Sequence, residues 1–188
     1  MFLVLLFLHL LAVAMLFAAV GIELAVYVAL HRAQTVAQAR AALSNGPLIG
    51  PIMGSGVLLL VAMGVAMVYV GGFGWQPWTI VVFIVTIVLA VNGPLTNGKR
   101  GEALYRLAQN ATDGPITPEL EAARLDRVLN YSVFMTACEL IAALYIMSNK
   151  PGLAGSLWAV AIAAAVALFP TALVTRKKAA APGSNVTA

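Results

Sequence analysis

The chain has 188 residues, of which 62% are hydrophobic and only 10% are charged. Soluble domains average about 25% charged residues, so this composition excludes a soluble globular fold and indicates an integral membrane protein. The single cysteine, Cys138, excludes an internal disulfide, and the two histidines, His9 and His31, exclude a multi-histidine metal cage. The net charge of +4 does not indicate a nucleic-acid partner, because basic residues set the orientation of a membrane protein.

Five apolar stretches are long enough to cross a bilayer as helices, which takes about 20 residues each. We therefore predict an all-α integral membrane protein, with a single bundle of five transmembrane helices over residues 1–175. The predicted spans cover residues 2–30, 48–70, 77–95, 128–148 and 153–175.

The basic residues predict the orientation of this bundle. Ten of the eleven lie on one side, in the loops 31–47 and 96–127 and in the tail 176–188, whereas Lys150 lies on the other. Since cytoplasmic loops carry the excess of lysine and arginine, we expect the N-terminus outside and the C-terminus in the cytoplasm. The predicted location is a bacterial-type inner (cytoplasmic) membrane, which the chain crosses several times, with a basic and flexible tail.

The cytoplasmic loops contain signals for short helices. Thr35 is expected to cap a helix over residues 36–43, and residues 100–110 form an amphipathic pattern. Thr117 precedes Pro118, a pair that predicts a helix start, and we expect that helix to continue into the fourth span. The loop 96–127 is either a connector at the membrane surface or a docking face for a cytoplasmic partner.

Two ionisable residues fall well inside the predicted spans, where a charge is costly, so Glu139 is expected to be protonated or paired. Three roles for Glu139 are open. It is a group that carries protons, a group that binds a ligand, or a neutral acid that forms a hydrogen bond to a neighbouring helix. His9 lies roughly 10 Å and Glu139 roughly 15 Å from the outer end, so a His9–Glu139 pair forms if their helices touch. Alternatively, His9 ligates a haem or metal, or bonds to a neighbouring carbonyl.

Glu23 lies near the inner end of the first span. On a helical wheel it shares one face with His9, Leu16, Val20 and Tyr27, so this face is expected to point into the bundle. Glu23 either belongs to the interior polar site or reaches the interface and meets Arg32 or Arg127.

The sequence Asn92-Gly93-Pro94 is expected to end the third span. The alternative is a kink in the helix, whose free carbonyls would line a polar cavity. Small residues in the second span predict close helix packing within the bundle or in a homodimer. They are Gly46, Gly50, Gly54, Gly56 and Gly64. Thioethers suit copper(I), but we interpret Met63 and Met67 as packing residues, because no histidine or cysteine shares their helix face.

The segments Leu8–Ala12, Gly21–Glu23 and Arg32–Thr35 resemble the opening of uncharacterised bacterial multi-pass membrane proteins with a histidine in the first helix. Such proteins are distantly similar to the copper-resistance D and HemJ-type protoporphyrinogen oxidase families. The resemblance implies that His9 ligates haem b or a metal. HemJ-type enzymes carry a lysine within a later helix, whereas the first lysine here is Lys99, beyond the third span. The copper family has several histidines, so neither named activity follows from the resemblance.

The favoured function is therefore an interior polar site around His9 and Glu139 that binds a small ligand or cofactor, with haem b as one candidate. Glu23 and Asn92 are the further candidate residues for a ligand or proton site. The alternatives are a proton or small-solute transporter or channel that uses Glu139, and a non-catalytic membrane subunit or assembly factor. The expected partners are the lipid bilayer and either a second copy or a membrane complex.

Overall fold

The structure is a computed structural model that describes residues 1–180, with side chains as far as residue 172. It contains, in chain order, α1 (Phe2–Arg32), α2 (Val36–Leu43), α3 (Gly46–Val70), α4 (Pro77–Asn92), the π-helix η1 (Gly93–Gly98), α5 (Lys99–Asn110), α6 (Pro118–Arg124), α7 (Arg127–Asn149) and α8 (Leu153–Ala180). Within the described residues there is no β-strand. The helix α8 includes residues 176–180, with which the predicted flexible tail begins, and residues 181–188 lie outside the described part.

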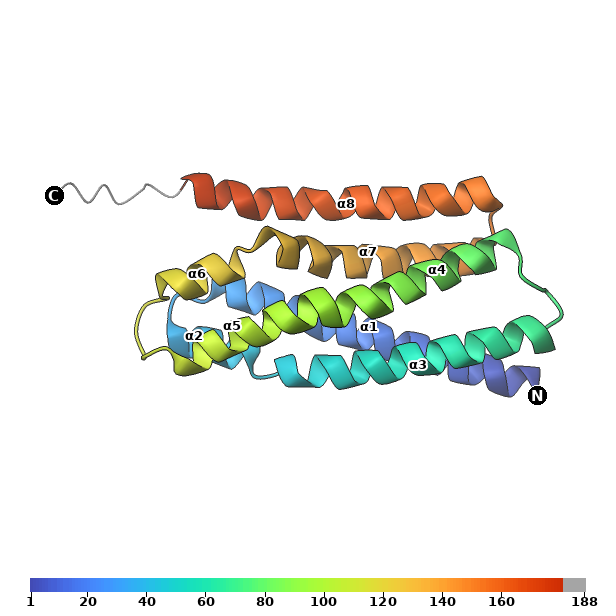
Figure 1. Cartoon of the computed structure of the whole chain (residues 1–188), viewed down its shortest axis with the longest axis horizontal. Coiled ribbons are helices and arrows are strands. Elements are labelled where there is room, and N and C mark those ends of the chain that lie inside the picture. The colour runs from blue at the N-terminus through green and yellow to red at the C-terminus, as the bar shows by residue number, and fades with distance from the viewer. Residues whose placement is uncertain (181–188) are drawn as a thin grey trace.

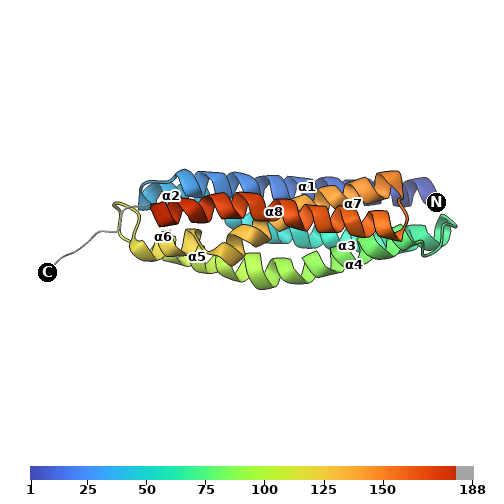
Figure 2. The same ribbon diagram turned by 90° about the horizontal axis from the view of Figure 1, so that it is seen from above.

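The prediction of an all-helical fold with five long apolar helices is confirmed for the described residues. The helical stretches that are long and apolar enough to cross a membrane are Phe2–Arg32, Val36–Val70, Pro77–Asn110, Pro118–Asn149 and Leu153–Ala172. They run side by side along one axis and make an elongated bundle (Figures 1 and 2).

The long helices associate mainly in two pairs. α1 packs along α3, and α7 packs along α8, while α4 lies against α7 (Figure 1). The short helices α2, α5 and α6 gather at one end of the bundle, which we call the capped end, and the N-terminus lies at the opposite end.

The predicted helix end at Asn92-Gly93-Pro94 is wrong. The chain continues from α4 through the π-helix η1 directly into α5. Pro94 has no N–H to donate and its ring obstructs the regular helix, and a wider π-turn accommodates such a defect without ending the helix. The third long helix therefore reaches Asn110 and carries residues after Asn92 along the bundle.

The predicted caps of the short helices are confirmed. The Thr35 hydroxyl accepts a hydrogen bond from the Gln38 N–H, and the Thr117 hydroxyl accepts one from the Leu120 N–H. However, α6 does not continue into α7 as we expected. The Asp126 carboxylate accepts the N–H of Leu129 and starts a new helix, because an aspartate satisfies a free N–H better as an N-cap than inside a helix.

The capped end has its own apolar core, built from the end of α1, the start of α7 and the three short helices. Its fully buried members include Val36, Leu104 and Leu120. Two arginines tie these helices together through backbone carbonyls. Arg40 donates to the carbonyls of Ala108 and Ala111, and Arg124 donates to those of Leu30 and Ala33. The two loops thus fold as one layer over the end of the bundle.

The glycines of α3 do not act as a single packing stripe. A Cβ at Gly56 would lie 3.1 Å from Leu16, so Gly56 allows α1 to approach α3 closely. At Gly46, Gly50 and Gly54, by contrast, no described atom beyond the local backbone of α3 lies within 4 Å of such a Cβ. The prediction of close packing within the chain is therefore wrong for these three positions.

Candidate functional site

A large cavity lies between the α1–α3 pair and the α4–α7 pair. Its volume is about 1070 Å³, at the upper end of the range of roughly 300–1,000 Å³ that is typical of small-molecule sites. Its walls come from α1, α3, α4, η1 and α7, with α5 and α2 closing it at the capped end. Most of the lining is apolar, and Gly46, Gly50 and Gly54 form part of the α3 wall. Because glycine has no side chain, this wall leaves the cavity wide.

The most buried ionisable group in the lining is Glu23 of α1, which is 9% exposed. The side-chain amide of Asn97 donates a hydrogen bond of 2.9 Å to Oε1 of Glu23. The other carboxyl oxygen, Oε2, and the amide oxygen of Asn97 have no partner among the described residues. The hydroxyl of Tyr27, one turn further along α1, is also buried without a described partner and lines the same cavity.

This arrangement confirms that the helix face with His9, Leu16, Val20 and Glu23 points into the bundle, since all four are buried. It also corrects the alternative for Glu23, whose side chain meets Asn97 rather than Arg32 or Arg127.

Asn97 was missed by the sequence reasoning, which placed it in a cytoplasmic loop beyond the expected helix end. Asn92 has a different role from the predicted one. Its amide donates to the Ser132 hydroxyl of α7, and its carbonyl oxygen accepts from the Thr96 hydroxyl. Asn92 therefore fastens the start of η1 to α7 and is not among the residues that line the large cavity. A polar residue a few positions after a proline inside an apolar helix is the signal that would have pointed to Asn97.

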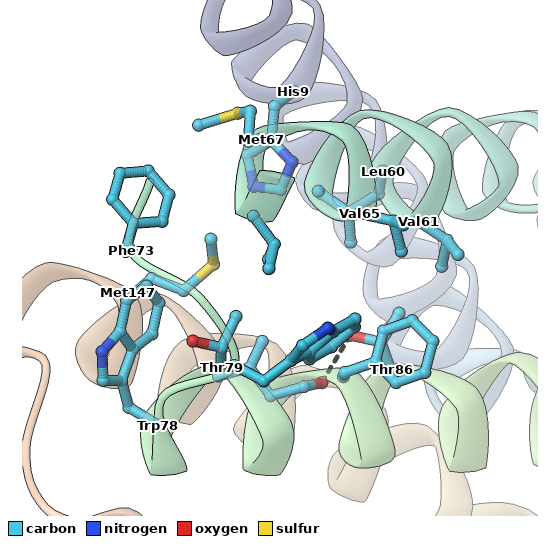
Figure 3. Close-up of a pocket in the computed structure, with 15 residues that line it drawn as sticks. His9, Leu60, Val61, Val65, Met67, Phe73, Trp78, Thr79, Thr86 and Met147 are labelled. Carbon is cyan, nitrogen blue, oxygen red and sulfur yellow. Dashed lines mark hydrogen bonds between the residues drawn. The ribbon is translucent and has the colours of Figure 1, made fainter. Parts of the chain in front are cut away.

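A second, small cavity of about 90 Å³ lies at the end opposite the capped end, beside His9 (Figure 3). His9 is 5% exposed, and its ring packs against Gly64 of α3. Neither ring nitrogen has a hydrogen-bond partner of normal geometry within the described residues, but the backbone of Leu60 on α3 lies close enough to the ring to interact with it, as the alternative of a neighbouring carbonyl predicts. Met67, Met147 and Trp78 contribute to the same lining, which is almost entirely apolar. The two cavities share Leu60, Val61, Val82, Thr86 and Met147, so they are neighbours.

Glu139 is buried on α7 and is 1% exposed. Both of its carboxyl oxygens lack a hydrogen-bond partner in the described part of the chain. Its neighbours along the same buried face of α7 are Thr136 and Ala142, yet Glu139 itself lines neither cavity. Most buried polar groups in proteins have hydrogen-bond partners, so Glu139 is an exception. Burying the protonated, neutral carboxyl costs less free energy than burying the charged carboxylate.

The predicted His9–Glu139 pair does not form. Among the described residues no hydrogen bond or salt bridge joins them, and His9 lines a cavity that Glu139 does not. The contact between α1 and α7 is much less extensive than that between α1 and α3, so α3, and not α7, supplies the surroundings of His9. A helix pairing of this kind depends on side-chain fit along whole helices, which depth in the membrane does not reveal.

The space beside His9 does not fit a haem. A volume of about 90 Å³ falls well below the roughly 300–1,000 Å³ of sites for organic ligands. We expect the purified protein to show no Soret band in its visible spectrum, either oxidised or reduced. A Soret band that disappears in His9→Ala would contradict this expectation and would place haem b on His9.

Comparison of the chain with protein-family models, with curated proteins and with solved structures gave no match.

Proposed function

We propose that the protein is a multi-pass membrane protein that binds an elongated apolar molecule with a hydrogen-bond-donating head in the large cavity. The observation that carries this proposal is a cavity of about 1070 Å³ with apolar walls and a buried Glu23–Asn97 pair near its middle. Such sites typically combine an apolar lining with a few polar groups that fix the orientation of the ligand.

The free atoms of the polar pair favour a head group that donates hydrogen bonds. Oε2 of Glu23 and the side-chain oxygen of Asn97 are acceptors without a described partner. Leaving buried acceptors unpaired costs about 1–3 kcal/mol each, and a hydroxyl or ammonium group supplies the missing donors. Long-chain alcohols and amines are therefore the ligand class that we propose.

The length of the cavity supports a chain-like ligand. From Glu23 towards the His9 end, its α1 wall extends to Val13, which is about 15 Å at 1.5 Å per residue. The head group would lie at Glu23 and the tail would point towards the His9 end, along walls that contain almost only apolar side chains.

The proposal predicts that Glu23→Gln weakens the binding of tritiated dodecanol to the protein in lipid nanodiscs, measured by scintillation proximity. A hydrogen bond to a carboxylate contributes about 1.5–3 kcal/mol, so the affinity should fall by roughly tenfold or more. The matched control is Glu119→Gln on the exposed surface of α6, which should bind like the unmodified protein. Equal affinities for dodecanol and dodecane would refute a site that recognises a head group.

We further propose that the five long helices cross the inner membrane with the N-terminus outside and the capped end in the cytoplasm. The support is the charge asymmetry, because Arg40, Arg100, Arg106, Arg124 and most other basic residues belong to the capped end or its neighbouring helix ends. The positive-inside rule then assigns that end to the cytoplasm.

Cysteine labelling checks this topology in a Cys138→Ser background. A membrane-impermeant maleimide should label Phe73→Cys from outside intact cells and should label Asn110→Cys only after the cells are opened. Labelling of position 110 from outside would reverse the proposed orientation.

A further inference from the structure

We propose that the large cavity opens sideways into the bilayer, through a slit between α3 and the third long helix, and that hydrocarbon chains of the membrane enter it there. One edge of the slit is α3, and the other is formed by α4, η1 and the start of α5. This inference rests on the proposed function, because it gives the ligand of the large cavity its source and its route.

The first support is that residues on both edges line the cavity and are also exposed. Those on α3 recur every three or four residues and form one row along the helix. They are Pro47, Gly50, Gly54 and Leu58, and those on the opposite edge are Ile87, Pro94 and Gly98.

The cavity alone does not produce this exposure. Leu16 and Val20 of α1 line the same cavity and are each only 6% exposed. By contrast, Leu58 is 73% and Ile87 is 40% exposed. The rows on α3 and on the third long helix therefore face the outside of the bundle as well as the cavity, which places an opening between them.

The second support is that little holds the two edges together. α3 packs mainly along α1, and its contact with α4 is slight. Among the described residues, no hydrogen bond, ion pair or ring contact joins α3 to α4, η1 or α5. At Gly50 and Gly54 the α3 edge has no side chain, and no described atom beyond the local backbone of α3 lies within 4 Å of a Cβ there. The slit is therefore widest at these glycines.

The third support is the chemistry and the length of the edges, which match hydrocarbon. α3, α4 and η1 contain no charged residue, and the first charges on the slit side are Lys99 and Glu102 at the capped end. The row from Pro47 to Leu58 is about 16 Å long, roughly half of a hydrocarbon core of about 30 Å. The slit thus spans about one leaflet, on the side of the capped end.

The fourth support is the polar group that the slit makes accessible from the membrane. Glu23 is 9% exposed, lines the cavity, and has no described partner for its Oε2 atom. A molecule dissolved in the bilayer reaches this acceptor through the slit without crossing the polar layer of short helices at the capped end. The occupant that we assign to the slit is therefore an acyl or alkyl chain from the membrane.

The test places a bimane fluorophore on Gly54→Cys in a Cys138→Ser background, in phosphatidylcholine liposomes with or without bromine on the acyl chains. Bromine quenches the fluorophore only on contact and so reports acyl chains, whereas iodide in the buffer reports water. We expect brominated chains to quench the probe and iodide to leave it unchanged. Dodecanol should relieve the quenching by bromine, because its chain displaces lipid from the slit.

The matched control is Gly21→Cys, at an exposed position of α1 outside the lining of both cavities. Brominated chains should quench this probe too, but dodecanol should not relieve the quenching. A probe on Ile87→Cys, at the opposite edge, should behave like the Gly54 probe. It gives a second reading if circular dichroism shows that the Gly54 variant is unfolded.

The outcomes separate this inference from the proposed ligand. Quenching by iodide at positions 54 and 87 would show an opening to water, and quenching by neither reagent would show a closed wall. Either result overturns the slit. Quenching by bromine that dodecanol leaves unchanged supports the slit and instead contradicts the binding of long-chain alcohols in the large cavity.

Discussion

Replacing Gly50 and Gly54 together by leucine is expected to lower the affinity for dodecanol by roughly 100-fold, because each new side chain opposes the ligand by about 1–3 kcal/mol. Both glycines line the large cavity, and no described atom beyond the local backbone of α3 lies within 4 Å of a Cβ at either position. The leucines therefore enter open space that the ligand would occupy.

The same change should not weaken the fold. Leucine favours a helix over glycine by up to about 1 kcal/mol per residue, so the free energy of unfolding should stay the same or rise. Gly21→Leu is the matched control, since Gly21 also faces open space on a long helix but lines neither cavity. If the double variant binds dodecanol as tightly as Gly21→Leu does, the large cavity is not the binding site.

Arg124→Ala is expected to lower the free energy of unfolding by about 2–4 kcal/mol, because hydrogen bonds to a charged group contribute about 1.5–3 kcal/mol each. The Arg124 guanidinium donates to the carbonyls of Leu30, at 3.0 Å, and Ala33, at 2.8 Å. These carbonyls lie at the end of α1, where the Leu30 carbonyl also accepts the Ala33 N–H and regular helical hydrogen bonds stop. The side chain is only 13% exposed and is also paired with Glu121, so water cannot replace it without loss.

Arg106→Ala is the control for this prediction. Arg106 pairs with Glu102 one turn away on α5, but its side chain is 73% exposed. Exposed pairs of this kind contribute about 0.3–0.5 kcal/mol, so this variant should unfold almost like the original protein. Unfolding in mixed micelles with increasing sodium dodecyl sulfate, followed by circular dichroism, compares the two. Equal losses in both variants would show that Arg124 does not hold the capped end to α1.

The large elements of the fold were predictable because a membrane helix is a local property. Each span needs only an apolar run of sufficient length, and the caps at Thr35 and Thr117 depend on a side chain and an N–H three residues apart. The predictions were wrong where one local sequence pattern is compatible with two different structures. Asn92-Gly93-Pro94 fits either a helix end or a wider turn, and packing in the bundle favours the π-helix η1.

The candidate site was harder to predict, because it depends on which helices are neighbours. His9 and Glu139 lie at compatible depths in the membrane, but α1 packs along α3, so Gly64 and Leu60 of α3 lie against His9 instead. Glu23 was recognised as an inward-facing carboxyl, whereas its partner Asn97 became visible only when η1 carried the third helix past Pro94.

The sequence by itself determined the helical class, the five apolar stretches that form the long helices, the caps of the short helices and the inward face of α1, since these follow from periodicity and composition within single segments. The tertiary structure alone decided the Glu23–Asn97 pair, the wide α3 wall at Gly50 and Gly54, and the packing of His9 against Gly64. These features arise where side chains from separate helices pack together. Such packing depends on the whole surfaces of both helices, so no single segment of the sequence predicts it.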